Sequence, residues 1–248
     1  METTCDGLLD KRVTIEQPKD GYRVAVDTVL LAASVPARAG ETALDLGCGA
    51  GGAMLCLAAR LPGVFLTGVE IQKELADLCA ANIARNKFAG LNVLRADAAL
   101  LPGDLAGTFD HVLMNPPYHD EARHDVSADA RKRMANTERE GDLARWVTGA
   151  AKALKPSGTL TLVHRADRQA EIEALLAPEF GAVEILPILP KPGIPPKRVI
   201  VRGKKGGTGD ARLCRHLVLH QADGRYTGQA EAILRHAKAL EFRHEAVT

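Results

Sequence analysis

The hydrophobic positions of this chain fall into short apolar runs separated by segments with helical spacing. Runs of about four to eight apolar residues between turn residues are typical of buried strands, and apolar positions three and four apart are typical of amphipathic helices. Seven strands are predicted, at residues 42–46, 64–69, 91–95, 110–114, 159–164, 182–189 and 199–202, followed by a final strand at 213–220. Helices are predicted at residues 27–33, 54–60, 71–87, 141–154, 167–176 and 226–240.

This alternation of strands and helices predicts an α/β fold. We expect a doubly wound, mainly parallel seven-stranded sheet with an antiparallel hairpin at the C-terminal end. Residues 1–40 are expected to form an N-terminal cap that includes an edge element at 11–17, and residues 41–248 the main domain. Ligands of such sheets bind at the carboxyl ends of the strands. The polar residues that follow the predicted strands are therefore expected to line one crevice.

Glycines cluster directly after the first predicted strand, in the sequence Asp45-Leu46-Gly47-Cys48-Gly49-Ala50-Gly51-Gly52. The spacing Gly47-x-Gly49-x-x-Gly52 fits the dinucleotide fingerprint, so an NAD-dependent oxidoreductase is one alternative. Asp45 argues against it, because a carboxylate there would repel a pyrophosphate but could hold a cationic ligand such as a sulfonium or amino group. Glu70 ends the next strand and would bind a ribose diol in either case.

A second motif, Asn115-Pro116-Pro117-Tyr118, follows the strand at 110–114. Proline has no N–H and ends the strand abruptly, which presents Asn115 and Tyr118 at the sheet's carboxyl edge. The side-chain carbonyl of Asn115 and the backbone carbonyl of Pro116 can accept from the two N–H groups of a planar amine, which favours the state in which its lone pair is available. Tyr118 can stack on a flat substrate. The alternative is a Pro-Pro turn with a capping Asn.

Three further regions carry candidate chemistry. Asp27 is either a ligand-binding residue or the N-cap of a short helix, and Asp97 either accepts from an adenine amino group or is a local capping residue. The long polar stretch at 119–140 is expected to be a functional lid or disordered. The basic hairpin around 190–205 is predicted to contact a phosphate backbone, with a solvated basic loop as the alternative. Its candidate RNA-binding residues are Lys191, Lys197, Arg198 and Arg202, and Lys204 and Lys205 complete its six cations.

Composition narrows the choice of partner and compartment. The net charge of +1 gives no global signature of a polyanion-binding protein, so any nucleic-acid contact would be a local patch. Five scattered cysteines, with no Cys-x-x-Cys pair, argue against a disulfide framework and against a zinc site. No signal peptide and no run of membrane-spanning length is found, which predicts a cytoplasmic protein with no membrane partner. No His, Cys or acidic residues have the tight spacing of a ligand set, which predicts no bound metal.

Taken together, these motifs resemble those of class I S-adenosylmethionine-dependent methyltransferases. The matching features are Asp45-Leu46-Gly47-Cys48-Gly49-Ala50-Gly51, an acid ending the second strand, an acid after the third, and Asn115-Pro116-Pro117-Tyr118. Within this class the chain is similar to the bacterial tRNA1(Val) adenine-37 N6-methyltransferase group. The segment 27–31 near the N-terminus and the segments 217–220 and 223–227 near the C-terminus carry that similarity.

The resemblance implies an S-adenosylmethionine cofactor and a tRNA adenine N6 as the acceptor. The implied catalytic residues are Asn115, Pro116, Pro117 and Tyr118. The implied cofactor-binding residues are Asp27, Asp45, Gly47, Cys48, Gly49, Gly51, Glu70, Ile71, Asp97, Ala98 and Asn115. No general base is required, because the amine loses its proton after attack. Alternative acceptors are an rRNA guanine N2, a protein glutamine amide and a small molecule. The oligomeric state, monomer or homodimer, is left open.

Overall fold

Strands and helices alternate through the middle of the chain, as the sequence pattern predicts. The computed structural model describes residues 1–20, 23–117 and 142–244. Its strands are β1 (Thr3–Leu8), β2 (Val13–Pro18), β3 (Thr42–Leu46), β4 (Phe65–Glu70), β5 (Leu91–Arg95), β6 (Phe109–Met114), β7 (Leu154–Arg165), β8 (Phe180–Leu189), β9 (Arg198–Lys205), β10 (Arg212–Leu213) and β11 (Leu217–Val218). Its α-helices are α1 (Val26–Ser34), α2 (Gly52–Arg60), α3 (Lys73–Asn86), α5 (Asp142–Ala153), α6 (Gln169–Leu176) and α7 (Gly228–Leu234).

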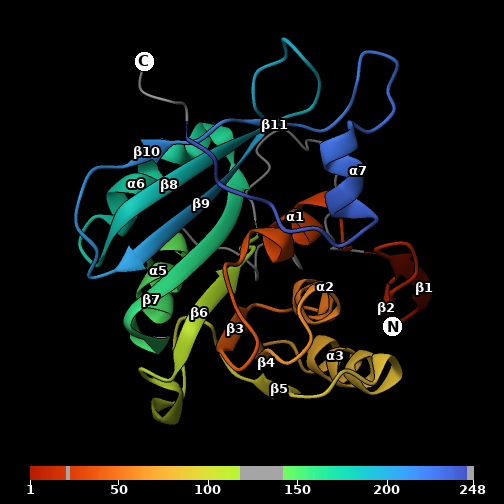
Figure 1. Cartoon of the computed structure of the whole chain (residues 1–248). Helices are drawn as coiled ribbons and strands as arrows, with labels where there is room; N and C mark the ends of the chain where they lie inside the picture. The colour runs from red at the N-terminus through yellow and green to blue at the C-terminus, as the bar shows by residue number, and fades with distance from the viewer. Residues whose placement is uncertain (21–22, 118–141, 245–248) are drawn as a thin grey trace, which may run out of the picture.

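The predicted seven-stranded sheet is confirmed. Its seven long strands follow the order β8-β9-β7-β6-β3-β4-β5, and the two-residue strands β10 and β11 pair with β8 (Figure 1). Strands β3 to β7 pair in parallel, whereas β9 runs antiparallel between β7 and β8, which is the expected C-terminal hairpin. The order reverses beside β3, because β4 lies on one side of it and β6 on the other. Ligands bind at such a switch point, at the carboxyl end of the strands.

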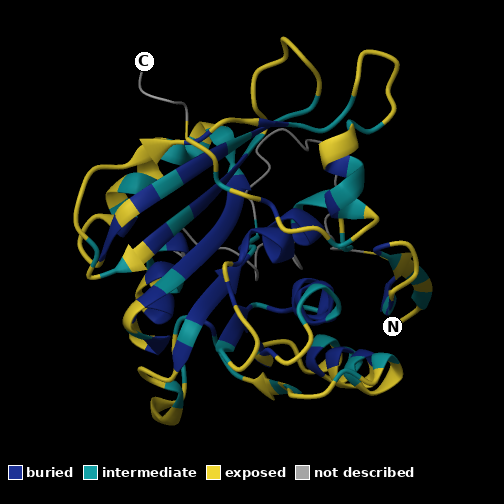
Figure 2. Cartoon of the chain, viewed as in Figure 1, coloured by how far each residue is buried: buried dark blue, intermediate teal, exposed yellow. Residues whose placement is uncertain are grey.

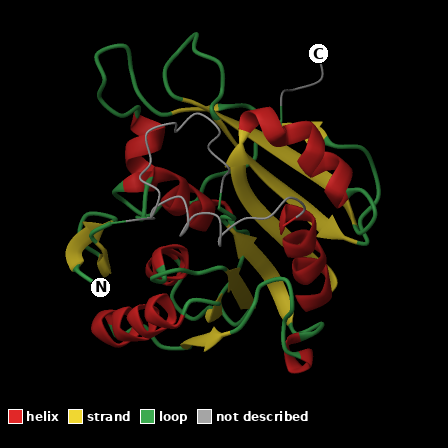
Figure 3. Cartoon of the chain, turned by 180° about the vertical axis from the view of Figure 1, so that it is seen from behind, coloured by secondary structure: helices red, strands yellow, loops and turns green. Residues whose placement is uncertain are grey.

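Helices cover both faces of the sheet, which confirms the doubly wound arrangement. One core packs α1, α2 and buried side chains such as Leu113 beneath them, and α7 joins it through Ile233. The other core packs α5 and α6 against side chains of the opposite face, among them Val112 and Met114. Successive residues of β6 therefore enter opposite cores. Figure 2 shows the central strands as largely buried, and Figure 3 shows α5 and α6 lying on the face turned to that view.

Two predicted elements near the C-terminus are wrong in extent. The expected strand at 213–220 is two separate pairs of residues, because the backbone of Arg215 between them donates to Arg243 O instead of to the sheet. The expected helix at 226–240 ends at Leu234. Ala237 takes a left-handed conformation (φ 53°) and Lys238 N donates back to Ala232 O, so the helix cannot continue.

The N-terminal region is a hairpin, β1–β2, that forms a two-stranded sheet of its own. It lies beside α2 and α3, away from the hairpin of β8 and β9 (Figure 1). The following helix α1 packs on α2 and contributes fully buried leucines to the same core as that helix. The division of the chain at residue 40 therefore stays a prediction.

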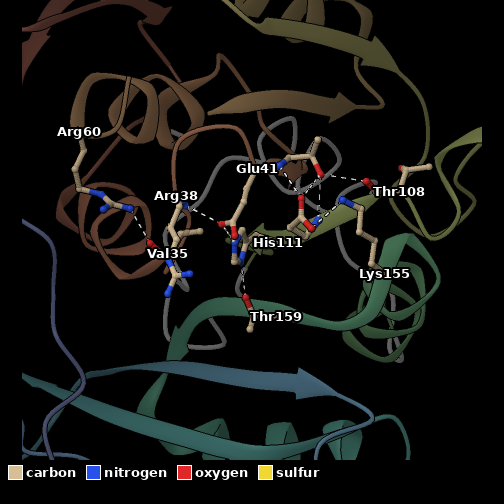
Figure 4. Close-up of polar contacts among 10 residues, drawn as sticks. Val35, Arg38, Glu41, Arg60, Thr108, His111, Lys155 and Thr159 are labelled. Atoms are coloured by element: carbon tan, nitrogen blue, oxygen red, sulfur yellow. Dashed lines mark hydrogen bonds and ion pairs between the residues drawn. The ribbon is translucent and has the colours of Figure 1, made fainter. Parts of the chain in front are cut away.

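A polar network closes the amino end of the parallel strands (Figure 4). The ring of His111 lies between Thr159 Oγ1 (2.6 Å from Nδ1) and Glu41 Oε2 (2.9 Å from Nε2). Beside it, Lys155 Nζ donates to Asp110 Oδ1 at 2.8 Å, and the backbone and hydroxyl of Thr42 donate to Asp110 Oδ2 at 2.9 and 2.8 Å. These bonds join β3, β6 and β7 at the end of the sheet opposite the predicted site.

Candidate active site

A cleft opens at the carboxyl end of β3, where the glycine-rich loop leads into α2. Its empty volume is about 470 Å³. The residues that line it are Gln17, Pro18, Val24, Thr28, Asp45, Gly47, Cys48, Gly49, Ala50, Gly52, Ala53, Leu75 and Asn115. The structure thus brings five of the sequence-predicted site residues, Asp45, Gly47, Cys48, Gly49 and Asn115, to one hollow at the switch point of the sheet.

The glycine loop has a backbone that requires glycine. Gly47 (φ 68°) and Gly49 (φ 55°) take left-handed conformations, which side chains with a Cβ rarely adopt. A Cβ on Gly47 would lie 2.3 Å from a ring carbon of Trp146 on α5. At Gly49 no heavy atom of the described residues comes within 4 Å of the Cβ position, so this stretch of backbone is open to the cleft. The loop can therefore approach a ligand through its main chain.

Asp45 is a buried carboxylate beneath this loop. It is 2% exposed, and its Oδ2 accepts a hydrogen bond from Met54 N, in the first turn of α2, at 3.1 Å. Burial raises the pKa of Asp45 to about 7, and the neighbouring Glu70 carboxylate adds to the rise. No cation of the described residues is among the groups that shift this pKa. A cationic ligand in the cleft would supply the missing positive charge.

Glu70 lies at the end of β4 and holds the loop from below. Its Oε2 accepts from Gly49 N at 3.0 Å and its Oε1 from Gln72 N at 2.8 Å. The side chain is buried, and burial raises its pKa while the backbone bonds from Gln72 and Gly49 oppose the rise. Each carboxylate oxygen has further lone pairs, so the group can still accept from a ligand's hydroxyls. In the structure its direct role is to fix the backbone at Gly49.

The proline motif directly follows β6. Met114 pairs with Leu46 of β3 and with Leu162 of β7, so Asn115 emerges between the two central strands. Asn115 is half-buried and lines the cleft together with Asp45, and Pro116 behind it is buried. Tyr118 and the predicted lid at 119–140 lie outside the described residues.

The remaining predicted cofactor residues have partners of their own. Asp27 is in the first turn of α1, whose N-cap is Ala25, and its Oδ2 accepts from Arg198 Nε at 2.8 Å, so the N-cap interpretation of Asp27 is wrong. Asp97 Oδ1 accepts from Ala99 N at 2.8 Å, the local turn contact that the capping alternative predicts. Ile71 is 58% exposed and Ala98 is buried against α5. Gly51 takes a left-handed φ of 93° and sits at the N-cap of α2. None of these five residues lines the cleft.

The cations of the basic hairpin lie in different surroundings, because the pairing of β9 with β7 and β8 separates them. Arg202 binds Glu184 through Nε and Nη2 at 2.9 and 2.6 Å and lies over the Phe242 ring, so its charge is used inside the protein. Lys205 donates to the carbonyls of Ala151, in the last turn of α5, and of Leu154, the first residue of β7. Because β9 runs antiparallel to β7, Lys204 stands at the amino end of the sheet. Lys191 and Lys197 are exposed in the loop that overhangs the carboxyl end.

The sequence analysis missed the wall of the cleft that the N-terminal segment supplies. Gln17, Pro18, Val24 and Thr28 line the cleft, and Gln17 is only 3% exposed. One signal was present in the sequence: Gln17 continues the alternating core-facing positions of β2 that begin with Val13 and Ile15. A polar side chain at a core-facing position must find partners inside the protein.

One group of metal-ligating side chains lies away from the cleft. The ligand atoms of Glu184, Cys214 and His244 lie within 4.8 Å of one another. His244 Nε2 is 3.1 Å from Glu184 Oε1, and the other carboxylate oxygen of Glu184, Oε2, accepts from Arg202. Burial raises the pKa of the Cys214 thiol to about 11. Glu184 is thus shared between Arg202 and His244 through hydrogen bonds.

The fold, the open glycine loop and the buried acid beneath it define a class I S-adenosylmethionine-dependent methyltransferase, and the resemblance stated above is confirmed. The chain belongs to the methyltransferase small domain family, whose model matches residues 22–188. S-adenosylmethionine is the cofactor of this class, which excludes the oxidoreductase alternative.

Individual relatives agree with this assignment. The chain is 28% identical to a Porphyromonas gingivalis protein named tRNA1(Val) (adenine(37)-N6)-methyltransferase, over 96% of each chain. The structure of a predicted O-methyltransferase from Agrobacterium tumefaciens, 28% identical, superposes with a TM-score of 0.73 over 89% of this chain and all of that one. A putative class I S-adenosylmethionine-dependent methyltransferase from Listeria monocytogenes shares the fold (TM-score 0.55, 15% identity, 80% of this chain and 68% of that one).

A search of the described helices for a membrane-spanning segment finds none that is both long and apolar enough.

Proposed function

We propose that the protein transfers the methyl group of S-adenosylmethionine to the N6 amino group of an adenine in tRNA. The observation that carries this proposal is the joint position of Asn115 and Asp45 in one cleft, at the switch point of the sheet. The cofactor's cationic end would lie near Asp45, and the target amine near Asn115. The similarity to the Porphyromonas gingivalis protein over nearly the whole of both chains supports a tRNA substrate.

The chemistry asks the protein to align three atoms: the attacking nitrogen, the methyl carbon and the sulfur. The methyl group moves from sulfur to nitrogen, sulfur keeps the electron pair of the broken bond, and the amine then loses a proton to solvent. Alignment of this kind lowers the barrier without a general base. The carbonyl oxygens of Asn115 and Pro116 would accept from the two N–H groups of the amine and orient its lone pair. Two acceptors suit a nitrogen better than a hydroxyl, which has one proton to donate.

An adenine in folded RNA must leave its stack to reach a cleft of this kind. Lys191 and Lys197, in the exposed loop between β8 and β9, would contact phosphates beside the flipped base. Arg198 is held by Asp27, so its position would link this loop to α1 next to the cleft. A tRNA substrate also agrees with the cytoplasmic location expected from the cysteine content.

The test is methyl transfer from labelled S-adenosylmethionine into total tRNA from a strain that lacks this protein, followed by nucleoside mass spectrometry. N6-methyladenosine is the expected product, and Asn115→Ala should not form it. Methylated guanine in ribosomal RNA, or label in protein or in small molecules, would replace the proposed acceptor while keeping the enzyme class. A 2′-O-methylated nucleoside would show that the acceptor is oxygen.

A further inference from the structure

Two asparagines of α3 attach the N-terminal hairpin to the body of the protein. Asn82 Oδ1 accepts from Glu16 N at 2.8 Å, and Asn82 Nδ2 donates to Glu16 O at 2.7 Å. One turn later, Asn86 Oδ1 accepts from Thr14 N at 2.9 Å and its Nδ2 donates to Thr14 O at 2.7 Å. Residues four apart share a helix face, and Thr14 and Glu16 share one edge of β2. The two side-chain amides therefore pair with β2 as a neighbouring strand would.

Asn82 also reaches the glycine loop. Its Nδ2 donates to Ala50 O at 2.9 Å, and the side chain is completely buried. Ala50 lines the cleft between Gly49 and Gly51. The side-chain amide of Asn82 thus binds β2 and the glycine loop at the same time. The second donor contact of Asn86 goes instead to Asn82 O, within α3. The two asparagines hold the same hairpin but differ in this one contact.

The end of β2 is fixed over the cleft by further contacts. Gln17 Nε2 donates to Asp6 Oδ2 at 2.9 Å, and Gln17 Oε1 accepts from Val24 N at 2.8 Å. Val24 in turn presses on the start of α2, because a Cβ on Gly52 would lie 2.4 Å from Val24 Cγ2. Both Gln17 and Val24 line the cleft. The N-terminal segment and the glycine loop are therefore neighbouring walls of one hollow.

We propose that the β1–β2 hairpin is a wall of the cofactor cleft and that Asn82 is the positioning residue that sets this wall against the glycine loop. The inference rests on the proposed placement of the cofactor beside the glycine loop. Asn82 acts through Ala50 and Glu16 and does not line the cleft. Bound cofactor would contact both walls, so its binding and the attachment of the hairpin would stabilise each other.

The test compares Asn82→Ala with Asn86→Ala in the full-length protein. Both variants lose contacts to β2, and both should lower the melting temperature. Asn82→Ala should weaken S-adenosylhomocysteine binding about tenfold and raise KM for S-adenosylmethionine in parallel, with kcat at saturating cofactor within about twofold of the parent. Asn86→Ala should change cofactor affinity by less than about twofold. Lower melting temperatures with unchanged cofactor affinity in both variants, or equal losses of affinity in both, would overturn the role assigned to Asn82.

A measurement on the unaltered protein does not depend on how the variants fold. Hydrogen exchange at the amides of Thr14 and Glu16 should slow when S-adenosylhomocysteine is added, together with exchange in the glycine loop. Slower exchange in the glycine loop alone would overturn the proposal while leaving the cofactor site in place. No change in either segment, despite binding measured by calorimetry, would overturn both the wall and the placement of the cofactor.

Discussion

The two ends of the central sheet each carry an aspartate, half-buried Asp110 and buried Asp45, and the two aspartates have opposite electrostatic surroundings. Asp110 stands at the amino end, where Lys155 and Thr42 bind both of its oxygens. Burial alone would raise the pKa of Asp110, but the bonds from Lys155 and Thr42 outweigh it and lower the pKa to about 2. Asp45, on the adjacent strand, has one backbone donor and a pKa raised to about 7.

The amino end is electrostatically complete. In Figure 4, the His111 ring of β6 bridges Thr159 of β7 and Glu41, the residue before β3, and each carboxylate has a partner beside it. The carboxyl end is incomplete, because Asp45 and Glu70 both have pKa values raised by burial. A carboxylate that is buried without a positive charge beside it lowers the free energy of unfolding. Its presence at this end indicates a bound group that supplies the positive charge. The amino end of the sheet therefore stabilises the fold, whereas the carboxyl end forms a binding site.

The largest effect is expected from Asn115→Ala. Loss of one of the two acceptors for the target amine should lower kcat about 10³-fold. S-adenosylhomocysteine should bind within about twofold of the parent, because Asn115 is not the partner of its ammonium group. Single-turnover methylation and calorimetry measure the two quantities. Asn92→Ala, at an exposed asparagine of β5, is the matched control and should leave both unchanged. A large loss of cofactor affinity in Asn115→Ala would instead assign Asn115 a structural role.

Asp45→Asn should weaken cofactor binding and stabilise the fold. The neutral side chain cannot attract the cofactor's cationic ammonium or sulfonium group, so the dissociation constant of S-adenosylmethionine should rise at least about tenfold at pH 8. The folded-state pKa of Asp45 is raised above its unfolded value, so the wild type loses stability as pH rises from about 4 to about 7. Above pH 7 the variant should therefore be more stable than the wild type, by about 4 kcal/mol in urea denaturation.

Calorimetry across pH 6–8 sharpens this prediction. Cofactor affinity of the wild type should rise through about pH 7 as Asp45 ionises, and the variant should show no such rise. A parallel rise in both proteins would assign the titration to another group.

Asp110→Asn should have the opposite profile: reduced stability and normal activity. The folded-state pKa of Asp110 is lowered, so its contribution is present above about pH 4 and is lost as pH falls toward 2. At pH 7 the variant should unfold with about 1–2 kcal/mol less free energy, measured by urea denaturation, and the difference should shrink below pH 4. Methyl transfer below the melting temperature should be unchanged, and a large loss of turnover would break the division between the two ends.

The smallest effect is expected from the loop. Reversal of Lys191 and Lys197 to Glu should weaken tRNA binding several-fold and flatten its salt dependence, because each removes a contact to phosphate. Lys204→Glu makes the same kind of change at the amino end of the sheet and serves as the control. Filter binding at several salt concentrations compares them. Equal effects at both ends, or none at either, would assign the loop cations to solvent.

Local hydrophobic patterns predicted most of the helices and strands. The features that they missed depend on contacts between residues far apart in the sequence. Strands 42–46 and 91–95 were predicted to the residue, because each is a short stretch rich in apolar residues that closely follows a glycine, Gly40 or Gly90. The sequence did not indicate the ion pair of Arg202, because its partner Glu184 meets it through the pairing of β8 with β9. Asn82 gave no signal, because a polar residue on a helix is ordinarily solvated, and its partner Glu16 lies 66 residues away in sequence. Gln17, a polar residue at a core-facing position of β2, was the one sequence signal for the cleft's N-terminal wall.

The position of Trp146 has a spectroscopic consequence. It is the single tryptophan of the chain, and its ring lies directly over Gly47, at the Cβ position that glycine leaves free. Indole emission responds to the polarity and mobility of its surroundings, so any ligand that enters beside Gly47 changes it. The protein therefore carries an intrinsic optical reporter beside its cleft, and cofactor titrations can be followed by fluorescence without a label. Each variant discussed above retains that reporter.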